Sequence, residues 1–369
     1  MQSVFIRTFG CAANHSRGEV MKGLLKEAGF SMVKTHKEAD VLLINSCVVK
    51  STTENRLRET CKKFSAAGRP MLVTGCAVDA IPDIIRKLSP MAGLVSSHHT
   101  LDIVPAVREV LAGGRAEFLG WRPEPKLCAP RLRDNPKMEI IEISQGCRGS
   151  CAFCLTKKAR GRLHCYPAAG IISAIEKAVS EGCTEIRLTS QDNADYRDGD
   201  VLLPELIRMV CRVPGNFKIR IGMMNPAGCK KIMAGLMEVY NMQKVEKFLH
   251  VPVQSGSDKI LRAMCRGHDS GCFREIVAAF RGAVPGIFIV TDIIAGFPGE
   301  TDSDFEDTLR MVGETKPGHV NISMYSDRQG TPASGMKKVR SEKIKERSRR
   351  LTVLVKSFSR APRPPVRLL

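Results

Sequence analysis

The sequence predicts an α/β protein of 369 residues, in which a small doubly wound parallel-sheet domain precedes a partial (β/α)6 barrel. Three observations predict this class. Short apolar runs alternate with amphipathic stretches over the first 115 residues, a stretch rich in proline and glycine follows, and the alternation then resumes with six further apolar runs. Strands that alternate with helices form parallel sheets whose two faces are covered by helices.

The first domain, residues 1–115, contains three apolar runs typical of buried strands and a shorter fourth one. They are VFIRTF (4–9), VLLIN (41–45), MLVT (71–74) and GLV (93–95). Helical spacing occupies the segments between and after them, at residues 16–28, 51–66, 80–88 and 101–112. We therefore expect a flavodoxin-like unit with a parallel sheet.

A linker over residues 116–137 leads to a second domain over residues 138–340, and a basic helix and tail occupy residues 341–369. The linker contains prolines and no clean periodicity. The strand candidates of the second domain are at 138–144, 185–190, 218–222, 247–253, 288–296 and 318–326. Six strands with helical segments between them fit a (β/α)6 partial barrel better than a second open sheet, although spacing alone permits both.

Composition restricts the class of protein and its partners. No apolar run approaches the roughly 18 residues of a membrane-spanning helix, and the N-terminus lacks a signal-peptide pattern, so we expect a cytoplasmic protein without a membrane partner. The formal net charge of +19 indicates a polyanionic partner such as nucleic acid. Residues 331–369 hold twelve Lys/Arg against two Glu, which is +10 of that charge, and such a segment is also typical of an ordinary solvated tail.

Fourteen cysteines in a chain without a secretion signal are expected to be reduced thiols or metal ligands. Three of them, Cys11, Cys47 and Cys76, each follow a predicted strand of the first domain, and we call them the first triplet. Because parallel strands point the same way, these thiols should emerge at one edge of the sheet, where open α/β sheets bind their ligands.

The second triplet, Cys147, Cys151 and Cys154, has the spacing C-x3-C-x2-C and follows the first strand of the second domain. Iron–sulfur clusters are ordinarily held by four thiolates, so three would leave one iron without a protein ligand. A zinc site would need a fourth ligand, for which His164 and Cys165 are candidates. The other cysteines have no ligand-like spacing and are expected to be small buried side chains: Cys61, Cys128, Cys165, Cys183, Cys211, Cys229, Cys265 and Cys272.

With an aromatic residue, Phe153, before its last cysteine, the second triplet resembles that of radical S-adenosylmethionine enzymes. A more specific resemblance is to the methylthiotransferases. It rests on TFGC-x2-N (8–14), INSC (44–47), VTGC (73–76), LTSQD (188–192), HVPVQSGS (250–257), TDIIAGFPGET (291–301) and YSDRQGTPA (325–333). The similarity covers residues 1–350, with the motifs in the expected order.

The sequence CRGSCAFCLTKKARG is most similar to the archaeal and eukaryotic branch that modifies N6-threonylcarbamoyladenosine beside the tRNA anticodon. RIGMMNP (220–226) also suits that branch. Two related branches remain alternatives, one acting on isopentenyladenosine in tRNA and one on a ribosomal-protein aspartate. A metal-containing RNA-binding protein without activity is an alternative from another class.

The resemblance implies two [4Fe–4S] clusters. The second triplet would bind a cluster whose open iron takes S-adenosylmethionine, and one electron would then yield a 5′-deoxyadenosyl radical that abstracts hydrogen from adenine C2. The first triplet would bind the cluster that carries the sulfur, and a second S-adenosylmethionine would supply the methyl group. The resemblance also implies tRNA as partner and an electron donor of flavodoxin or ferredoxin type, and we expect a monomer.

The resemblance further implies contacts to the cofactor at the strand ends of the barrel. Phe153 would pack on the adenine, and Gly296 would allow close approach of the backbone. The polar contacts to methionine and ribose would come from Ser190, Asp192, Gln254 and Ser255. Arg160 would neutralise a phosphate or the threonyl carboxylate of the substrate, or else lie in an ordinary solvated basic loop.

The sequence departs from the family pattern in two places. After LTSQD, Asn193 and Ala194 replace the usual Thr-Gly, which puts any role of this loop in doubt. Family members normally end in a β-barrel RNA-binding module, whereas here only APRPPVRLL follows residue 360. Nine residues cannot build a barrel, so we expect the module to be absent and tRNA binding to be weaker and strongly dependent on salt.

Overall fold

A computed structural model describes residues 1–48 and 51–358, and the end of the predicted tail, 359–369, lies outside the described residues. The chain divides into two compact units. The first contains residues 1–147 and 155–186, and the second contains residues 148–154 and 187–358. The sequence boundaries at 115, 137 and 340 stay a prediction.

The core of the first unit is a parallel sheet in the order β2-β1-β3-β4-β5-β6. Its strands are β1 (Ser3–Thr8), β2 (Ser31–Met32), β3 (Val41–Ser46), β4 (Met71–Gly75), β5 (Gly93–Val95) and β6 (Glu117–Phe118). The first five strands have the flavodoxin-like order 2-1-3-4-5, which confirms the predicted class and places the change of winding direction between β1 and β3. The sequence pattern missed β2 and β6, which have two residues each.

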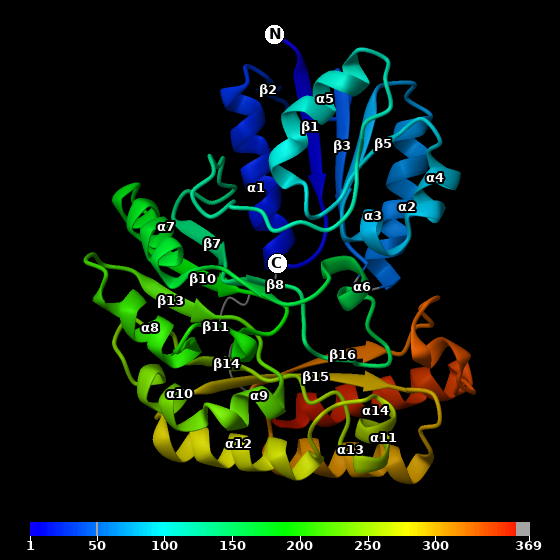
Figure 1. Cartoon of the computed structure of the whole chain (residues 1–369). Helices are drawn as coiled ribbons and strands as arrows, with labels where there is room; N and C mark the ends of the chain where they lie inside the picture. The colour runs from blue at the N-terminus through cyan, green and yellow to red at the C-terminus, as the bar shows by residue number, and fades with distance from the viewer. Residues whose placement is uncertain (49–50, 359–369) are drawn as a thin grey trace. The chain divides into compact units, whose positions relative to one another are not determined.

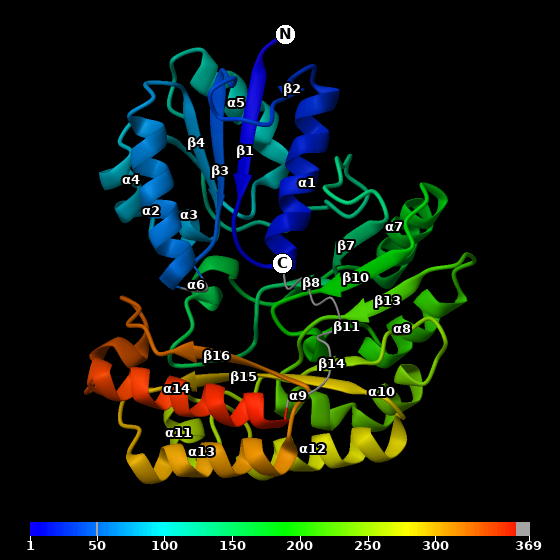
Figure 2. The ribbon, with the colours of Figure 1, turned by 180° about the vertical axis from the view of Figure 1, so that it is seen from behind.

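Helices cover both faces of this sheet, as predicted (Figures 1 and 2). They are α1 (Ala12–Glu27), α2 (Ser51–Ser65), α3 (Cys76–Ala80), α4 (Pro82–Leu88) and α5 (Ile103–Leu111). On one face, α1 and α5 bury Met21, Leu25, Val107 and Val110 against the strands. On the other, α2 and α4 bury Leu57, Phe64 and Ile85. Burial of such side chains stabilises the fold by about 1.5–3 kcal/mol each.

The first unit also contains short elements that follow the sheet in sequence. They are β7 (Met138–Glu142), the antiparallel pair β8 (Ser144–Gln145) and β9 (His164–Cys165), α6 (Thr156–Arg160) and α7 (Ala168–Ser180). Helix α6 packs against α3, and its Ala159 and the N-cap residue Leu155 join the core on the α2 and α4 side. It is therefore held near the carboxyl end of β4.

The second unit alternates strands and helices, as the sequence predicts. Its strands are β10 (Glu185–Thr189), β13 (Lys218–Ile221), β14 (Phe248–His250), β15 (Phe288–Ala295) and β16 (His319–Met324), with the small hairpin β11 (Arg197–Asp198) and β12 (Val201–Leu202). Strands β14, β15 and β16 are parallel neighbours, and β13 lies next to β10.

The helices of the second unit follow its strands in turn. They are α8 (Leu203–Arg212), α9 (Pro226–Lys231), α10 (Met233–Tyr240), α11 (Asp258–Ala263), α12 (Ser270–Ala283), α13 (Asp302–Thr315) and α14 (Ser341–Phe358). Helix α14 packs on β16 and α13 (Figure 2). No helix in the described part of the chain has the length and apolar character needed to cross a membrane.

Candidate functional site

The structure places the first triplet at the carboxyl ends of three neighbouring strands. Cys11 is the N-cap residue of α1, which begins four residues after β1 ends. Cys47 directly follows β3, and Cys76 directly follows β4 as the first residue of α3. Because β1, β3 and β4 are adjacent and parallel, the three cysteines share one edge of the sheet.

Two glycines make room for this arrangement. Gly10 has φ 109°, and a Cβ there would lie 2.5 Å from Cβ and 2.7 Å from Sγ of Cys47. Gly75 has φ 87°, and its Cβ would lie 2.4 Å from the carbonyl oxygen of Ser46. All three distances are far below van der Waals contact, so each glycine allows one cysteine loop to approach its neighbour.

Asn14 joins the loops that carry Cys11 and Cys47. Its buried Nδ2 donates hydrogen bonds to the carbonyl oxygens of Phe9 (2.6 Å) and Ser46 (2.9 Å). In return, Nδ2 of Asn45 donates to the carbonyl oxygen of Asn14 (2.7 Å). The hydroxyl of Ser46 accepts from the backbone N–H of Ala77 (3.2 Å), which connects this network to the Cys76 helix.

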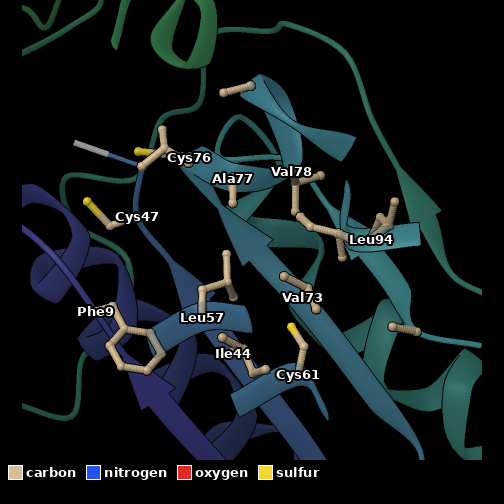
Figure 3. Packing of buried hydrophobic residues seen from close by; sticks show 14 of the residues in the cluster. Phe9, Ile44, Cys47, Leu57, Cys61, Val73, Cys76, Ala77, Val78 and Leu94 are labelled. Atoms are coloured by element: carbon tan, nitrogen blue, oxygen red, sulfur yellow. The ribbon is translucent and has the colours of Figure 1, made fainter. Parts of the chain in front are cut away.

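The electrostatic environment of Cys76 includes the other two thiols of the first triplet. Burial raises the pKa of the Cys76 thiol well above its ordinary value, and the neighbouring Cys47 and Cys11 add to the rise, whereas Arg17 opposes it. In Figure 3, Cys47 and Cys76 lie at the same end of the packed core, while Cys61 lies inside it. Cys47 and Cys76 are each 2% exposed, and burial also raises the pKa of the Cys11 thiol.

Arg160 lies in the interior of the first unit. It is 1% exposed, its Nη2 donates to Oδ1 of Asn14 (3.3 Å), and its Nη1 is 4.0 Å from Glu142. The following residue, Gly161, lies against the ring of Trp121, because a Cβ on Gly161 would be 2.7 Å from Cδ1 of that ring. The solvated loop considered for Arg160 is thus not observed, and its contact with nucleic acid stays a prediction.

The loop of the second triplet runs between β8 and α6. Within the second unit, the N–H of Ala152 donates to the carbonyl oxygen of Met264 (3.0 Å), and the carbonyl of Ala152 accepts from Ala333 (2.9 Å). The N–H of Cys154 donates to the carbonyl of Cys151 (3.1 Å), which closes a tight turn around the cysteines. His164 and Cys165, the candidates for a fourth zinc ligand, form β9.

Arg266 is a neighbour of this triplet that the sequence did not reveal. Its Nη1 donates to Sγ of Cys151 (3.3 Å), and its Nη2 donates to the carbonyl oxygen of Pro252 (2.8 Å). It follows Cys265, which has a left-handed backbone (φ 54°). Arg266 therefore links the loop of the second triplet to the residues that follow β14.

Three predicted cofactor residues, Phe153, Ser190 and Asp192, are half-buried or buried. The ring of Phe153 packs edge-on against Phe297, with centroids 6.4 Å apart. Ser190 is 8% exposed, and its hydroxyl has no hydrogen-bond partner among the described residues. Asp192 caps a 3-10 turn through the N–H of Ala194 and accepts hydrogen bonds from the backbone and side chain of Asn225.

Gln254, Ser255 and Gly296 lie at the ends of strands, and each is in contact with other parts of the protein. Gln254 has a left-handed backbone (φ 77°) and bridges to β15. The hydroxyl of Ser255 lies 3.3 Å from that of Thr308. A Cβ on Gly296 would lie 2.4 Å from Cγ1 of Ile344, so helix α14 approaches this glycine. The cofactor roles of all six residues stay predictions.

The cysteine side chains of the two triplets suit an iron–sulfur cluster better than a site for a single metal ion. Among residues 1–48 and 51–358, no three His, Cys, Asp or Glu side chains are already grouped to share one metal ion. Each triplet would nevertheless supply three sulfur ligands, and each has a guanidinium beside a cysteine or its supporting residue, Arg266 in one and Arg160 in the other. Sulfur donors with nearby cations suit an anionic iron–sulfur centre.

Some other expectations from the sequence need correction. Cys128 and Cys265 are exposed, although ordinary buried thiols were expected there. The basic tail is partly neutralised, because Arg347 is buried against Glu300 (2.8 Å) and Arg350 pairs with Glu306 (2.6 Å). Its charge is therefore not all available to a polyanion.

Comparison with known families agrees with this geometry. Residues 141–312 match the model of the radical SAM superfamily, and residues 3–97 match "Uncharacterized protein family UPF0004". The two matches correspond to the regions of the second and first triplets. The radical SAM match identifies an enzyme superfamily that uses S-adenosylmethionine and a [4Fe–4S] cluster.

Curated relatives extend over nearly the whole chain. The "Probable threonylcarbamoyladenosine tRNA methylthiotransferase" of Methanothermobacter thermautotrophicus is 40% identical over 354 residues, which are 95% of this chain and 83% of the relative. The threonylcarbamoyladenosine tRNA methylthiotransferases of Xenopus laevis and Homo sapiens are 37% and 36% identical. They cover 97% of this chain, which spans 66% and 63% of their lengths.

Solved structures share the fold at low identity. The radical S-adenosylmethionine methyltransferase TsrM from Kitasatospora setae has a TM-score of 0.66 at 13% identity, covering 90% of this chain and 75% of that one. The cobalamin-dependent S-adenosylmethionine radical enzyme OxsB has a TM-score of 0.62 at 10% identity, covering 97% and 56%. With the radical SAM match, these likenesses confirm the predicted fold class, and the relatives confirm the predicted branch. This chain belongs to the threonylcarbamoyladenosine tRNA methylthiotransferase family of radical SAM enzymes.

Proposed function

We propose that this chain methylthiolates C2 of N6-threonylcarbamoyladenosine next to the tRNA anticodon, with one [4Fe–4S] cluster on each cysteine triplet. The observation that supports this most directly is the first triplet. Three cysteines far apart in sequence share the carboxyl edge of one parallel sheet, and a second set of three follows as C-x3-C-x2-C. A second cluster would give the first set a role that the single cluster of the second triplet does not.

When bound, the clusters and S-adenosylmethionine supply the one-electron chemistry at adenine C2, the sulfur and the methyl group. The residues of this chain bind and orient these groups. Asn14 and Ser46 fix the spacing of the first triplet, and the turn at Ala152 fixes that of the second. The free hydroxyl of Ser190 and the side chain of Gln254 are our candidates for contacts to the cofactor.

The proposed partners are tRNA, S-adenosylmethionine and an electron donor of flavodoxin or ferredoxin type, with the chain acting as a monomer. Exposed cations of α14 would contact phosphates, which position a nucleic acid without reading its sequence. Lys345 and Arg349 are exposed on this helix. Binding through such contacts should weaken as salt concentration rises.

Nucleoside mass analysis tests the substrate and the activity together. The tRNA of cells with the gene should contain the 2-methylthio form of N6-threonylcarbamoyladenosine. Deletion of the gene should leave N6-threonylcarbamoyladenosine without the methylthio group. Complementation with Cys47→Ala or Cys151→Ala should fail. Cys61→Ala is the matched control, because Cys61 is a fully buried thiol of the same unit as Cys47 and belongs to neither triplet.

Anaerobic reconstitution tests the cofactors separately. The intact chain should bind about eight irons, and removal of either triplet should leave about four. Stoichiometric zinc without iron, or a methylthio nucleoside that persists after deletion, would refute the proposal.

A further inference from the structure

A cluster of buried charges lies beside the residues that support the first triplet, and the family resemblance assigned a role only to its Arg160. Glu142 on β7 accepts hydrogen bonds from the guanidinium of Arg17 (3.0 Å and 3.1 Å to Nη2, 3.3 Å to Nε) and also pairs with Lys126. Arg160 lies 4.0 Å from the same carboxylate. All four residues belong to the first unit, and their side chains are at most 4% exposed.

The cations in this cluster exceed what Glu142 can pair. Arg17 and Lys126 also share the side-chain oxygen of Gln145, at 3.0 Å and 3.2 Å. Even so, Nη1 of Arg17 and Nη1 of Arg160 have no hydrogen-bond acceptor among the described residues. Glu124, which is 3% exposed, is a second buried carboxylate that acts on Arg17 and Lys126. Buried cationic N–H groups without acceptors are costly, and an anion beside these two guanidinium groups would complete them.

The charge cluster contacts the residues that hold the first triplet. Nη2 of Arg160 donates to Oδ1 of Asn14, and Nδ2 of the same side chain binds the loops of Cys11 and Cys47. Arg160 ends α6, which packs on α3, the helix that begins at Cys76. Arg17 lies six residues along α1 from Cys11, about 1.7 helical turns.

We propose that Arg17, Lys126 and Arg160 supply the positive charge that balances an anionic iron–sulfur centre on the first triplet and eases its reduction. This inference rests on the proposed cluster at that site. Three thiolates around an iron–sulfur core carry net negative charge, and an added electron increases it. A fixed cation nearby therefore stabilises the reduced form more than the oxidised form, which raises the reduction potential.

The alternative is that these residues only tie α1 and α6 to β7. If their role is purely structural, replacing one of these cations by a neutral side chain should change stability and leave the reduction potential of the cluster unchanged. Measurement of the reduction potential, rather than of enzyme activity, therefore distinguishes the two roles.

The test uses the full chain with Cys147→Ala, Cys151→Ala and Cys154→Ala, so that only the first triplet can bind iron. Into this parent we introduce Arg160→Gln, which removes the charge and keeps a hydrogen-bonding side chain, and Arg160→Lys, which keeps the charge. Iron content and the midpoint of an anaerobic redox titration with dithionite are measured. At the midpoint of the parent, the ratio of reduced to oxidised cluster in Arg160→Gln should fall about tenfold, a shift of about 59 mV for one electron.

Arg133→Gln is the matched control. It removes one positive charge from the same unit, where Arg133 pairs with Glu139 and Glu181. The midpoints of Arg133→Gln and Arg160→Lys should equal that of the parent. If Arg160→Gln loses iron, Lys126→Met tests the same charge without touching Asn14 and should shift the midpoint in the same direction.

An unchanged midpoint in Arg160→Gln and Lys126→Met at full iron content would overturn the inference. An equal shift in Arg133→Gln would overturn it too, because the effect would then be nonspecific. A parent chain that binds no iron would instead overturn the two-cluster function on which the inference depends.

Discussion

Replacement of Gly10 by alanine should expel Cys47 from its position in the first triplet. The new Cβ would lie 2.5 Å from Cβ and 2.7 Å from Sγ of Cys47, against about 3.5–4.0 Å for an ordinary contact between carbon atoms. The cysteine must therefore move by about 1 Å or more, or the backbone of Gly10 must leave its φ of 109°. Overpacking of this kind costs about 1–3 kcal/mol.

Gly29→Ala isolates this steric effect. Gly29 belongs to the same unit, has φ 90°, and a Cβ there would meet nothing within 4 Å. Both substitutions place alanine in a left-handed backbone, which costs about 1–2 kcal/mol, and only Gly10→Ala adds the clash. The expected losses in free energy of unfolding are about 2–5 kcal/mol for Gly10→Ala and about 1–2 kcal/mol for Gly29→Ala.

Iron content is the decisive assay. In a chain that lacks the second triplet, Gly29→Ala should bind about four irons and Gly10→Ala markedly fewer. Urea unfolding followed by circular dichroism gives the stability difference. If Gly10→Ala retained full iron and unfolded at the same urea concentration as Gly29→Ala, the steric reasoning would be refuted.

Three further predictions follow from single contacts. Asn14→Ala should lower the free energy of unfolding by about 2–4 kcal/mol, because two buried carbonyl oxygens lose their donor. A urea midpoint equal to that of the unsubstituted chain would contradict this prediction. Burial raises the pKa of Glu300 from 4.5 to about 7, so the folded chain holds a proton that the unfolded chain releases, and the free energy of unfolding should fall as pH rises through this interval. Glu300→Gln should remove that slope in urea titrations between pH 4.5 and pH 7, and an unchanged slope would exclude Glu300 as its source. In a chain that lacks the first triplet, Arg266→Gln should make the redox midpoint of the remaining cluster more negative, because Sγ of Cys151 loses a hydrogen bond. Arg266→Lys should preserve the midpoint. Equal midpoints in the two variants would mean that this contact does not tune the cluster.

The main strands could be predicted from the sequence because each is a continuous apolar run bounded by turn residues. Strands β3 and β4 are buried at every position, as such runs require in a parallel sheet. Strands β2 and β6 could not be predicted, because two residues carry no period. Strand β6 also falls in the stretch interpreted as a linker, and only pairing with β5 defines it.

The first triplet could be predicted because a thiol directly after a buried strand has a known place in a parallel sheet. The contact between Arg17 and Glu142 could not, since 125 residues separate them and neither belongs to a motif. Arg160 has basic neighbours in sequence, which left an anion contact and a solvated loop as alternatives, yet tertiary packing of α6 on α3 buries it. Long-range ion pairs leave no local pattern, so only the folded chain reveals them.

The contact between Trp121 and Gly161 has a practical consequence. Trp121 is the single tryptophan of the sequence, it is 53% exposed, and its ring centre is 6.3 Å from that of His98. Its fluorescence therefore comes from the first unit alone, beside the end of α6. Because iron–sulfur clusters absorb across the range of tryptophan emission, quenching of this one indole, in a chain that lacks the second triplet, would follow the binding of a cluster to the first triplet in real time without a label.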